Sequence, residues 1–401
     1  MGDASSVRLA IVQETTFGTN PGTGFDYLRF NSESLRLDIG NVQSGQIDPT
    51  RQPSANIRVN LNASGGIVSE DSLIAPVASP GTGFDPLIEG AMMSDWSTIV
   101  ALTTQDIDIS AVVGGTFTLT DPTATGVAFA GVAVGDWIKL SGFAVNGTIY
   151  AHVLVKTSAD DIDCEGVRST GVAVTAETGQ TNVAISGSTI KIGTTKKSFT
   201  IERQYTDLTT PEYSLYTGMR VNSWGMRLTS QAIFEHTFDF LGKLQATTTS
   251  TGAGSPAAVW STPILEGVDH FKMKMLGTFE SVLATARMTE VSFDLNNNNR
   301  TEPELGVLGS TDIGISTPTL SGTFRLYMTD ADFIRLAEAG TRSKMAFRLD
   351  DGTRQRIIAF NSILFGTPDA PAQGNDQSVI TTLPWSAEAD SSGVALTVSR
   401  F

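Results

Sequence analysis

The stretch "RVNSWGMRL" at residues 220–228, followed by "IFEHTFDFLG" at residues 233–242, decides the fold class. Apolar and polar side chains alternate strictly in the second segment, and a period of two is typical of a half-buried β-strand. The pair predicts neighbouring strands with an aromatic face and an acidic face, which could line a binding cleft, a catalytic groove or a wall. The aromatic face holds Phe234, His236, Phe238 and Phe240, and the other face holds Glu235, Thr237 and Asp239.

Composition extends this prediction to the whole chain. The 401 residues include 39 glycines and 20 phenylalanines, and only 17% of them are charged. Frequent glycine turns with abundant Thr, Val and Phe are typical of β proteins. We therefore expect an all-β fold, divided into about two or three domains because of its length.

Charge and cysteine content limit the classes of function. The formal net charge is −15, which argues against a surface that grips nucleic-acid phosphates. Cys164 is the single cysteine, so no intrachain disulfide can form, and the first residues lack a secretory signal pattern. No window reaches the roughly 20 apolar residues of a membrane helix. We expect a soluble protein that folds in a reducing cytosol and does not enter a membrane.

The order of segments suggests several parts. Turn-rich residues 1–26 predict an extended N-terminal arm, and residues 84–94 predict a short helix with Asp85 as its cap and Pro86 at its first position. The Ala-, Val- and Thr-rich residues 99–192 predict a small independent β-barrel or sandwich. A polar Ser/Thr/Gly stretch at 247–261 predicts a flexible linker.

Similar segments recur in the same order in both halves of the chain, which indicates an internal duplication. The first unit would comprise residues 1–98 and 193–246, interrupted by the insertion at 99–192, and the second unit residues 262–401. Each unit would be a β-sandwich or barrel with one short helix. The matched segments are 33–41 with 290–298, Ser64-Gly65 with Ser321-Gly322, 84–92 with 331–340, Phe199 with Phe347, and Asn222-Ser223 with Asn361-Ser362.

No set of residues carries a catalytic or metal-binding signature. The three histidines, His152, His236 and His270, lie in separate segments without metal-ligand spacing. The acidic run 160–165 lacks the frame of a calcium loop, so a solvated turn is the favoured interpretation, and Cys164 within it would be inert. Neither a nucleophile elbow nor a phosphate loop is present, although sequence alone does not exclude a pair of glycosidase carboxylates. We expect no enzyme activity and no cofactor.

Six stretches together resemble the major tail tube proteins of long non-contractile-tailed (siphovirus-type) bacteriophages. The resemblance covers nearly all of the chain except the insertion, in a form with a duplicated tube fold. The stretches are "LAIVQETTFGTNP", "SESLRLDIGNVQSGQI", "TTKKSFTIERQYTD", "GVDHFKMKMLG", "VSFDLNNNN" and "TLPWSAEAD".

This resemblance implies a structural virion protein of two packed β-sheets and a helix, whose units join sheet to sheet into rings that stack as the tail tube. Assembly would take place in the host cytoplasm, with the tape measure and tail terminator as further partners, and DNA would pass through without specific binding. Two units per chain imply rings of three chains, with the insertion facing outward; the rival is a ring of six chains. Alternation then places these candidate acids on the lumen: Asp38, Glu202, Glu235, Asp239, Glu290 and Asp294.

Two other classes remain open. A carbohydrate-binding or adhesin protein would also be acidic, Thr-rich and all-β, and it would use Trp137 and Tyr150 as exposed platforms for sugar rings. The favoured interpretation of both is as core aromatics of the small barrel. A polysaccharide-cleaving enzyme ranks third.

Overall fold

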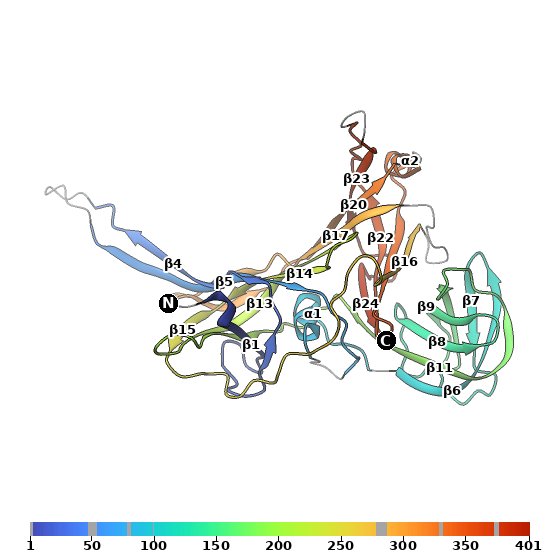
Figure 1. The fold of residues 1–401 in the computed structure, drawn as a ribbon, viewed down its shortest axis with the longest axis horizontal. Coiled ribbons are helices and arrows are strands. Elements are labelled where there is room, and N and C mark those ends of the chain that lie inside the picture. The colour runs from blue at the N-terminus through green and yellow to red at the C-terminus, as the bar shows by residue number, and fades with distance from the viewer. Residues whose placement is uncertain are drawn as a thin grey trace.

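A computed structural model describes residues 3–46, 54–77, 82–98, 100–277, 287–328, 332–372 and 377–401. Within these ranges the regular structure is almost entirely β, with two short α-helices, so the predicted all-β class is confirmed. Figure 1 shows two β bodies in contact, a separate barrel beside the second, and a long hairpin that projects from the first.

The first unit is built from ten strands and helices that come mainly from the first 250 residues. Its strands pair antiparallel in the order β1–β12–β13–β14–β5–β4. The elements are β1 (Val7–Gln13), β2 (Asp26–Leu28), β3 (Ser32–Glu33), β4 (Arg36–Gln43), β5 (Asn56–Glu70), α1 (Asp85–Met92), β12 (Phe199–Tyr205), β13 (Glu212–Thr229), β14 (Glu235–Gly242) and β15 (Leu244–Thr248), after a 3-10 turn at Ala4–Ser6.

The second unit repeats this order of pairing. Its strands run antiparallel as β16–β21–β22–β23–β20–β17. The elements are β16 (Phe271–Gly277), β17 (Met288–Asn296), β18 (Arg300–Pro303), β19 (Ser310–Gly314), β20 (Thr319–Tyr327), α2 (Asp332–Ala339), β21 (Ser343–Asp350), β22 (Gln355–Phe365), β23 (Ile380–Ala387) and β24 (Leu396–Arg400).

A single strand joins the two units. The C-terminal half of β13 pairs with β14 on one edge and with β17 on the other, so that Gly225 lies opposite both Thr237 and Asp294. The result is one continuous antiparallel sheet in the order β4–β5–β14–β13–β17–β20–β23. The two units therefore share a sheet and not merely a contact surface.

The predicted small β domain is a closed six-stranded barrel. Its strands pair in the circular order β6–β7–β10–β9–β8–β11 and back to β6. Closure removes the free strand edges that would invite aggregation, and a hydrophobic cluster around Phe117 and Leu140 fills the interior. The strands are β6 (Val100–Val113), β7 (Thr116–Thr120), β8 (Trp137–Phe143), β9 (Gly147–Lys156), β10 (Asp161–Arg168) and β11 (Glu177–Lys191).

One hydrophobic core runs through both units, and buried ion pairs cross it. Trp224 stacks on Phe238 of the first unit and meets Phe293 of the second edge to face. Within this core Arg356 of β22 donates to Asp71 of the first unit at 2.9 Å, and Arg400 of β24 binds Asp85 of α1. Removing one member of such a pair leaves a buried charge without its partner, which is strongly destabilising. These pairs therefore fix the units relative to each other.

Three local predictions need correction. Residues 7–13 of the expected arm form β1, an interior strand whose Leu9 and Ala10 are fully buried. The expected flexible linker is packed against the first unit: Ala257 bonds to Phe25 and Tyr27, and Trp260 meets Phe84 edge to face. Asp85 does not cap α1, because Phe84 holds the cap position and the Asp85 carboxylate binds Arg400 instead.

Candidate functional site: the polar face of the shared sheet

The continuous sheet has an aromatic face and a polar face. Phe234, Phe238 and Phe240 are buried, whereas Glu235 and Asp239 are exposed, as the alternation predicts. The register carries the polar side across both units, because Asp239 lies opposite Gly66 and Ser223, and Asp294 opposite Gly225 and Ser321. We call this surface the polar face; its charged members are Arg36, Asp38, Glu70, Arg227, Glu235, Asp239, Glu290, Asp294 and Arg325.

The polar face is weakly negative. It carries six carboxylates and three guanidinium groups, a difference of three negative charges. Arg36 forms a salt bridge with Asp38 at 2.9 Å. The Glu290 carboxylate forms salt bridges with Arg227 at 3.0 Å and with Arg325 at 3.7 Å. The arginines thus neutralise the acids near the two ends of the face. The carboxylates outside these ion pairs are Glu70 and Glu235, which lie opposite each other, and Asp239 and Asp294 in the middle of the face.

In the middle of the polar face, Asp239 and Asp294 repel each other. Partial burial and the nearby charge of Asp239 together raise the pKa of Asp294 above its usual range. Asp239 accepts a hydrogen bond from the hydroxyl of Ser223 at 3.0 Å. At Asp38, burial would raise the pKa, but hydrogen bonds from Ser64 and Arg36 hold it below its usual range. A cation placed near Asp239 and Asp294 would therefore relieve the repulsion between their carboxylates.

Five of the six predicted acids share this face, and Glu202 does not. Asp38, Glu235, Asp239, Glu290 and Asp294 all lie on it.

Glu202 lies on β12 and is fully buried, so it presents no charge to solvent. Its carboxylate accepts hydrogen bonds from Gln204 at 2.8 Å, Thr251 at 2.7 Å and the backbone of Gly252 at 2.5 Å. The predicted linker covers that face of β12, which alternation alone cannot reveal.

Trp137 and Tyr150 are not exposed platforms for sugar rings. Both are buried, and they lie on the outside of the barrel, against the second unit. Tyr150 meets Phe401 edge to face and donates to Gln355 at 2.8 Å, while the guanidinium of Arg348 lies over its ring. The two aromatics therefore dock the barrel on β22 and β24. They belong neither to a glycan site nor to the barrel core.

The described residues allow two kinds of site to be checked, a metal cluster and a histidine–carboxylate pair. Among them, no three potential ligands cluster as a metal site would require. Trp224 donates to His236 Nδ1 at 3.0 Å, so His236 Nε2 carries the proton and donates to Asp71 at 2.7 Å. The hydrogen bonds from Trp224 through His236 to Asp71 resemble part of a catalytic triad. His236 and Asp71 are, however, fully buried, with no route for a substrate.

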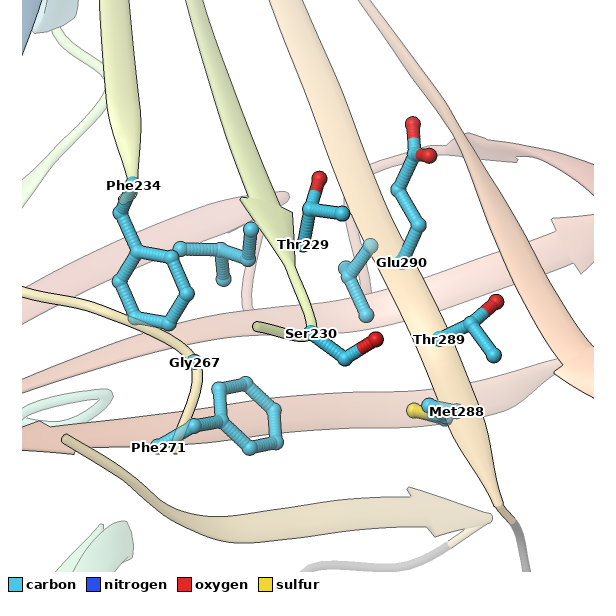
Figure 2. Close-up of a pocket in the computed structure, with 10 residues that line it drawn as sticks. Thr229, Ser230, Phe234, Gly267, Phe271, Met288, Thr289 and Glu290 are labelled. Atoms are coloured by element: carbon cyan, nitrogen blue, oxygen red, sulfur yellow. The ribbon is translucent and has the colours of Figure 1, made fainter. Parts of the chain in front are cut away.

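A small pocket of about 50 Å³ lies where β13 ends beside the start of β17. Figure 2 shows the rings of Phe234 and Phe271 in its wall, with the carboxylate of Glu290 pointing away from them. That carboxylate is engaged by Arg227 on the polar face. The pocket is too small for an organic substrate of ordinary size.

Two features of the structure escaped sequence reasoning. Arg356 and Arg400 hold the units together through buried acids, but no pattern distinguishes them from surface arginines. The strand "NIRVNL" at 56–61 alternates like a half-buried strand, yet Ile57 and Val59 are exposed. Alternation alone does not show that both side chains stay exposed in the single chain.

Comparison with known families agrees with this architecture. A family model described as phage tail tube protein matches residues 4–387. The chain belongs to the phage tail tube protein family. It is accordingly a structural component of the virion tail, of a kind that self-assembles with other tail proteins. A search of curated proteins found no match. No helix in the described ranges is long and apolar enough to cross a membrane.

Proposed function

We propose that this protein polymerises as stacked rings into the tail tube, and that the polar face lines the bore through which DNA is ejected. The observation that carries the proposal is the continuity of that face across both units of one chain. A basic wall would hold phosphates by releasing counterions and would slow the passage of DNA. A hydrophilic, weakly negative wall lets the duplex slide. No enzymatic step is needed for this role.

We also propose that the chain is an internal duplication with an inserted barrel, divided near the predicted boundaries 99–192, 247–261 and 262–401. The matching order of strand pairing supports this: β1, β12, β13, β14, β5 and β4 correspond to β16, β21, β22, β23, β20 and β17. Helices α1 and α2 follow the corresponding strands β5 and β20. Two units per chain would make a ring of six units from three chains.

The barrel would then decorate the outside of the tube, since it docks on the second unit through Ile357, Ala359 and Phe401, which are not part of the polar face. Synthesis and assembly would take place in the host cytoplasm. The further partners would be the tape measure protein, which sets tail length, and the tail terminator, which closes the end of the tube. These partners follow from the family and not from any site on this chain.

Electron microscopy of the purified protein tests the proposal. We expect rings or long hollow polymers at high protein concentration, with a central channel wide enough for duplex DNA. A protein that stays monomeric under tail-assembly conditions, while its thermal unfolding shows a cooperative fold, would overturn it.

A further inference from the structure

The β4–β5 hairpin is an unfinished surface. It projects away from the rest of the first unit (Figure 1). Among the described residues β4 pairs only with β5, so its outer edge is open. Ile39, Val42, Ile57 and Val59 are between 48% and 59% exposed. Ile39 and Val42 are three residues apart on a strand and therefore lie on opposite faces of the hairpin. An open edge with apolar side chains on both faces is a template for another chain.

The corresponding strand pair of the second unit, β17 and β20, has no open edge at β17. The outer edge of β17 is taken by β13, with Arg227 opposite Ser292. The segment beyond β17, which contains β18 and β19, rests on the first unit. There Asp312 accepts from Arg220 at 2.8 Å and from Lys196 at 2.7 Å, and Asn297 donates to the Ala91 carbonyl at 2.9 Å.

Strand registers identify the residues that would repeat this junction. Asp294 lies opposite Ser321 as Arg36 lies opposite Ser64, so Arg36 corresponds to Asp294. On the other side, Gly225 lies opposite Thr237, and the corresponding pair in the second unit is Asp369 with Thr382, which exchange backbone hydrogen bonds of 2.9 and 2.7 Å. This assignment follows the ladder step by step: Gly66 with Asp239 corresponds to Thr323 with Pro384.

We propose that β4 of one chain pairs antiparallel with residues 366–372 of a neighbouring copy, with Arg36 directly opposite the neighbour's Asp369. The pairing copies the β13–β17 junction, and it rests on the proposed assembly into rings. The charges are complementary: Arg36 and Asp369 are both exposed and both lie on the side of the polar face. Opposite charges at directly opposed positions stabilise a strand pair.

The rest of the hairpin would then lie against the second unit of that neighbour, as β18 and β19 lie against the first unit. Helix α2 offers the space, because its C-terminal residues Glu338 and Ala339 are exposed, whereas α1 is buried at Ala91 and Met92. The apolar residues of the hairpin replace the ion pairs of the junction within the chain. The contact between chains is thereby chemically distinct from the contact inside one.

Paired cysteines test the register. Directly opposite residues have Cβ atoms about 4.5–5.5 Å apart, near enough for a disulfide after small adjustments. Oxidation of the variant Arg36→Cys/Asp369→Cys should link chains covalently, and the ladder on a non-reducing gel should stop at the number of chains in one ring. The matched control, Gly225→Cys/Asp294→Cys, should close inside one chain without any increase in mass. The native Cys164 is buried and stays unreactive.

Each outcome separates this proposal from the function on which it rests. Tubes without links at 36 and 369, alongside closure of the control pair, overturn the strand pairing and leave the tube in place. Links without tubes support the pairing and overturn the tube. Neither tubes nor links overturn both.

A charge exchange and a hairpin variant give independent readouts. Arg36→Glu or Asp369→Lys alone should raise the critical concentration for assembly about two- to fivefold, and the double variant should restore it. Ile57→Ser/Val59→Ser should abolish assembly without changing the melting temperature, since those side chains are exposed in the monomer. The same change at Val145 and Val155, exposed residues of the barrel, should have no effect on assembly. Equal effects of the two double variants would contradict the docking.

Discussion

Asp85 is a buried carboxyl whose ionisation opposes folding. Burial raises its pKa to about 6, although Arg400 and Arg356 pull the other way and Glu89 adds to the rise. Burial likewise lowers the pKa of Arg400, its partner. Burial therefore opposes the charged form of both Asp85 and Arg400, although the two side chains are hydrogen-bonded to each other.

Stability should therefore fall as pH rises through the range of this group. The folded pKa lies above the unfolded value of 3.8, so the folded state binds the proton more tightly. Its contribution is complete below about pH 4 and lost by about pH 6, with a magnitude on the order of 3 kcal/mol at most. Urea unfolding from pH 4 to pH 7 measures the trend.

The variant Asp85→Asn serves as the comparison for that measurement. Its stability should lack the decline between pH 4 and pH 6, because an amide does not titrate in this range. Parallel pH profiles for the two proteins would show that another group is responsible.

The acids in the middle of the polar face should govern how DNA moves through the tube. Asp239→Lys/Asp294→Lys places two cations where two acids repel each other, so the monomer should fold at least as well. Tubes should assemble, but ejection should slow, through an attraction that weakens with added salt. Ejection rates at several salt concentrations measure this.

Lysines on the barrel, at the exposed positions Thr104 and Thr170, are the control for that experiment. They add cations to the same protein on the surface proposed to face outward, and ejection should be unchanged. If both double variants slow ejection equally, or if neither does, the polar face does not line the bore.

At the level of elements, the barrel should be removable if its last strand is kept. Ser97 and Thr189 exchange hydrogen bonds of 2.8 and 2.9 Å, so the two ends of the insertion lie side by side. Residues 188–191 of β11, however, pair with β24 and complete the sheet of the second unit. Deleting 101–186 with a short glycine link should preserve tubes of smaller outer diameter, as measured by negative-stain microscopy.

Deleting the whole of 99–192 is the contrasting variant. Both deletions uncover Ile357 and Phe401. The larger deletion also removes the strand beside β24, so it should be markedly less stable than the smaller deletion and assemble poorly. Equal assembly of the two deletions would mean that residues 188–191 contribute nothing to the second unit. Loss of tubes from both, with the fold intact, would place the barrel inside the assembly contacts.

Strands and helices with clear local patterns could be predicted, and features that depend on a second layer could not. The strict alternation of 233–242 gave the right buried face because that strand has one covered side. In β12, Thr200 and Glu202 are buried as well as Ile201, since the 247–261 segment covers the other side. Nothing in "FTIERQY" encodes that cover.

The proposed internal duplication shows the same limit. Matching letters placed Asn222 over Asn361, whereas the pairing registers place Gly225 over Asp369 and hence Val221 over Phe365. Ser64 over Ser321, by contrast, agrees with the registers. Strand sequences are too alike to fix an alignment, but hydrogen-bond ladders fix it residue by residue.

At the scale of the whole molecule, two units per chain predict three-fold rings with six similar wall segments. Strand number and tilt set the circumference of a closed wall, whether three or six chains supply the strands. We expect three chains of 42.5 kDa per ring and three outward barrels, measured as mass per ring by scanning microscopy or as symmetry in a reconstruction. Six chains per ring would show that the second unit does not contribute to the wall.

The junction between β13 and β17 has a consequence for the kinetics of growth. It forms while the chain folds, so in the proposed ring of six units half of the seams would be closed before any two molecules meet. Tethered partners meet at effective concentrations in the millimolar range, far above those of free subunits. Ring initiation should then scale with about the third power of protein concentration, where separate units would require the sixth. We therefore expect tubes to start at protein concentrations too low for separate units.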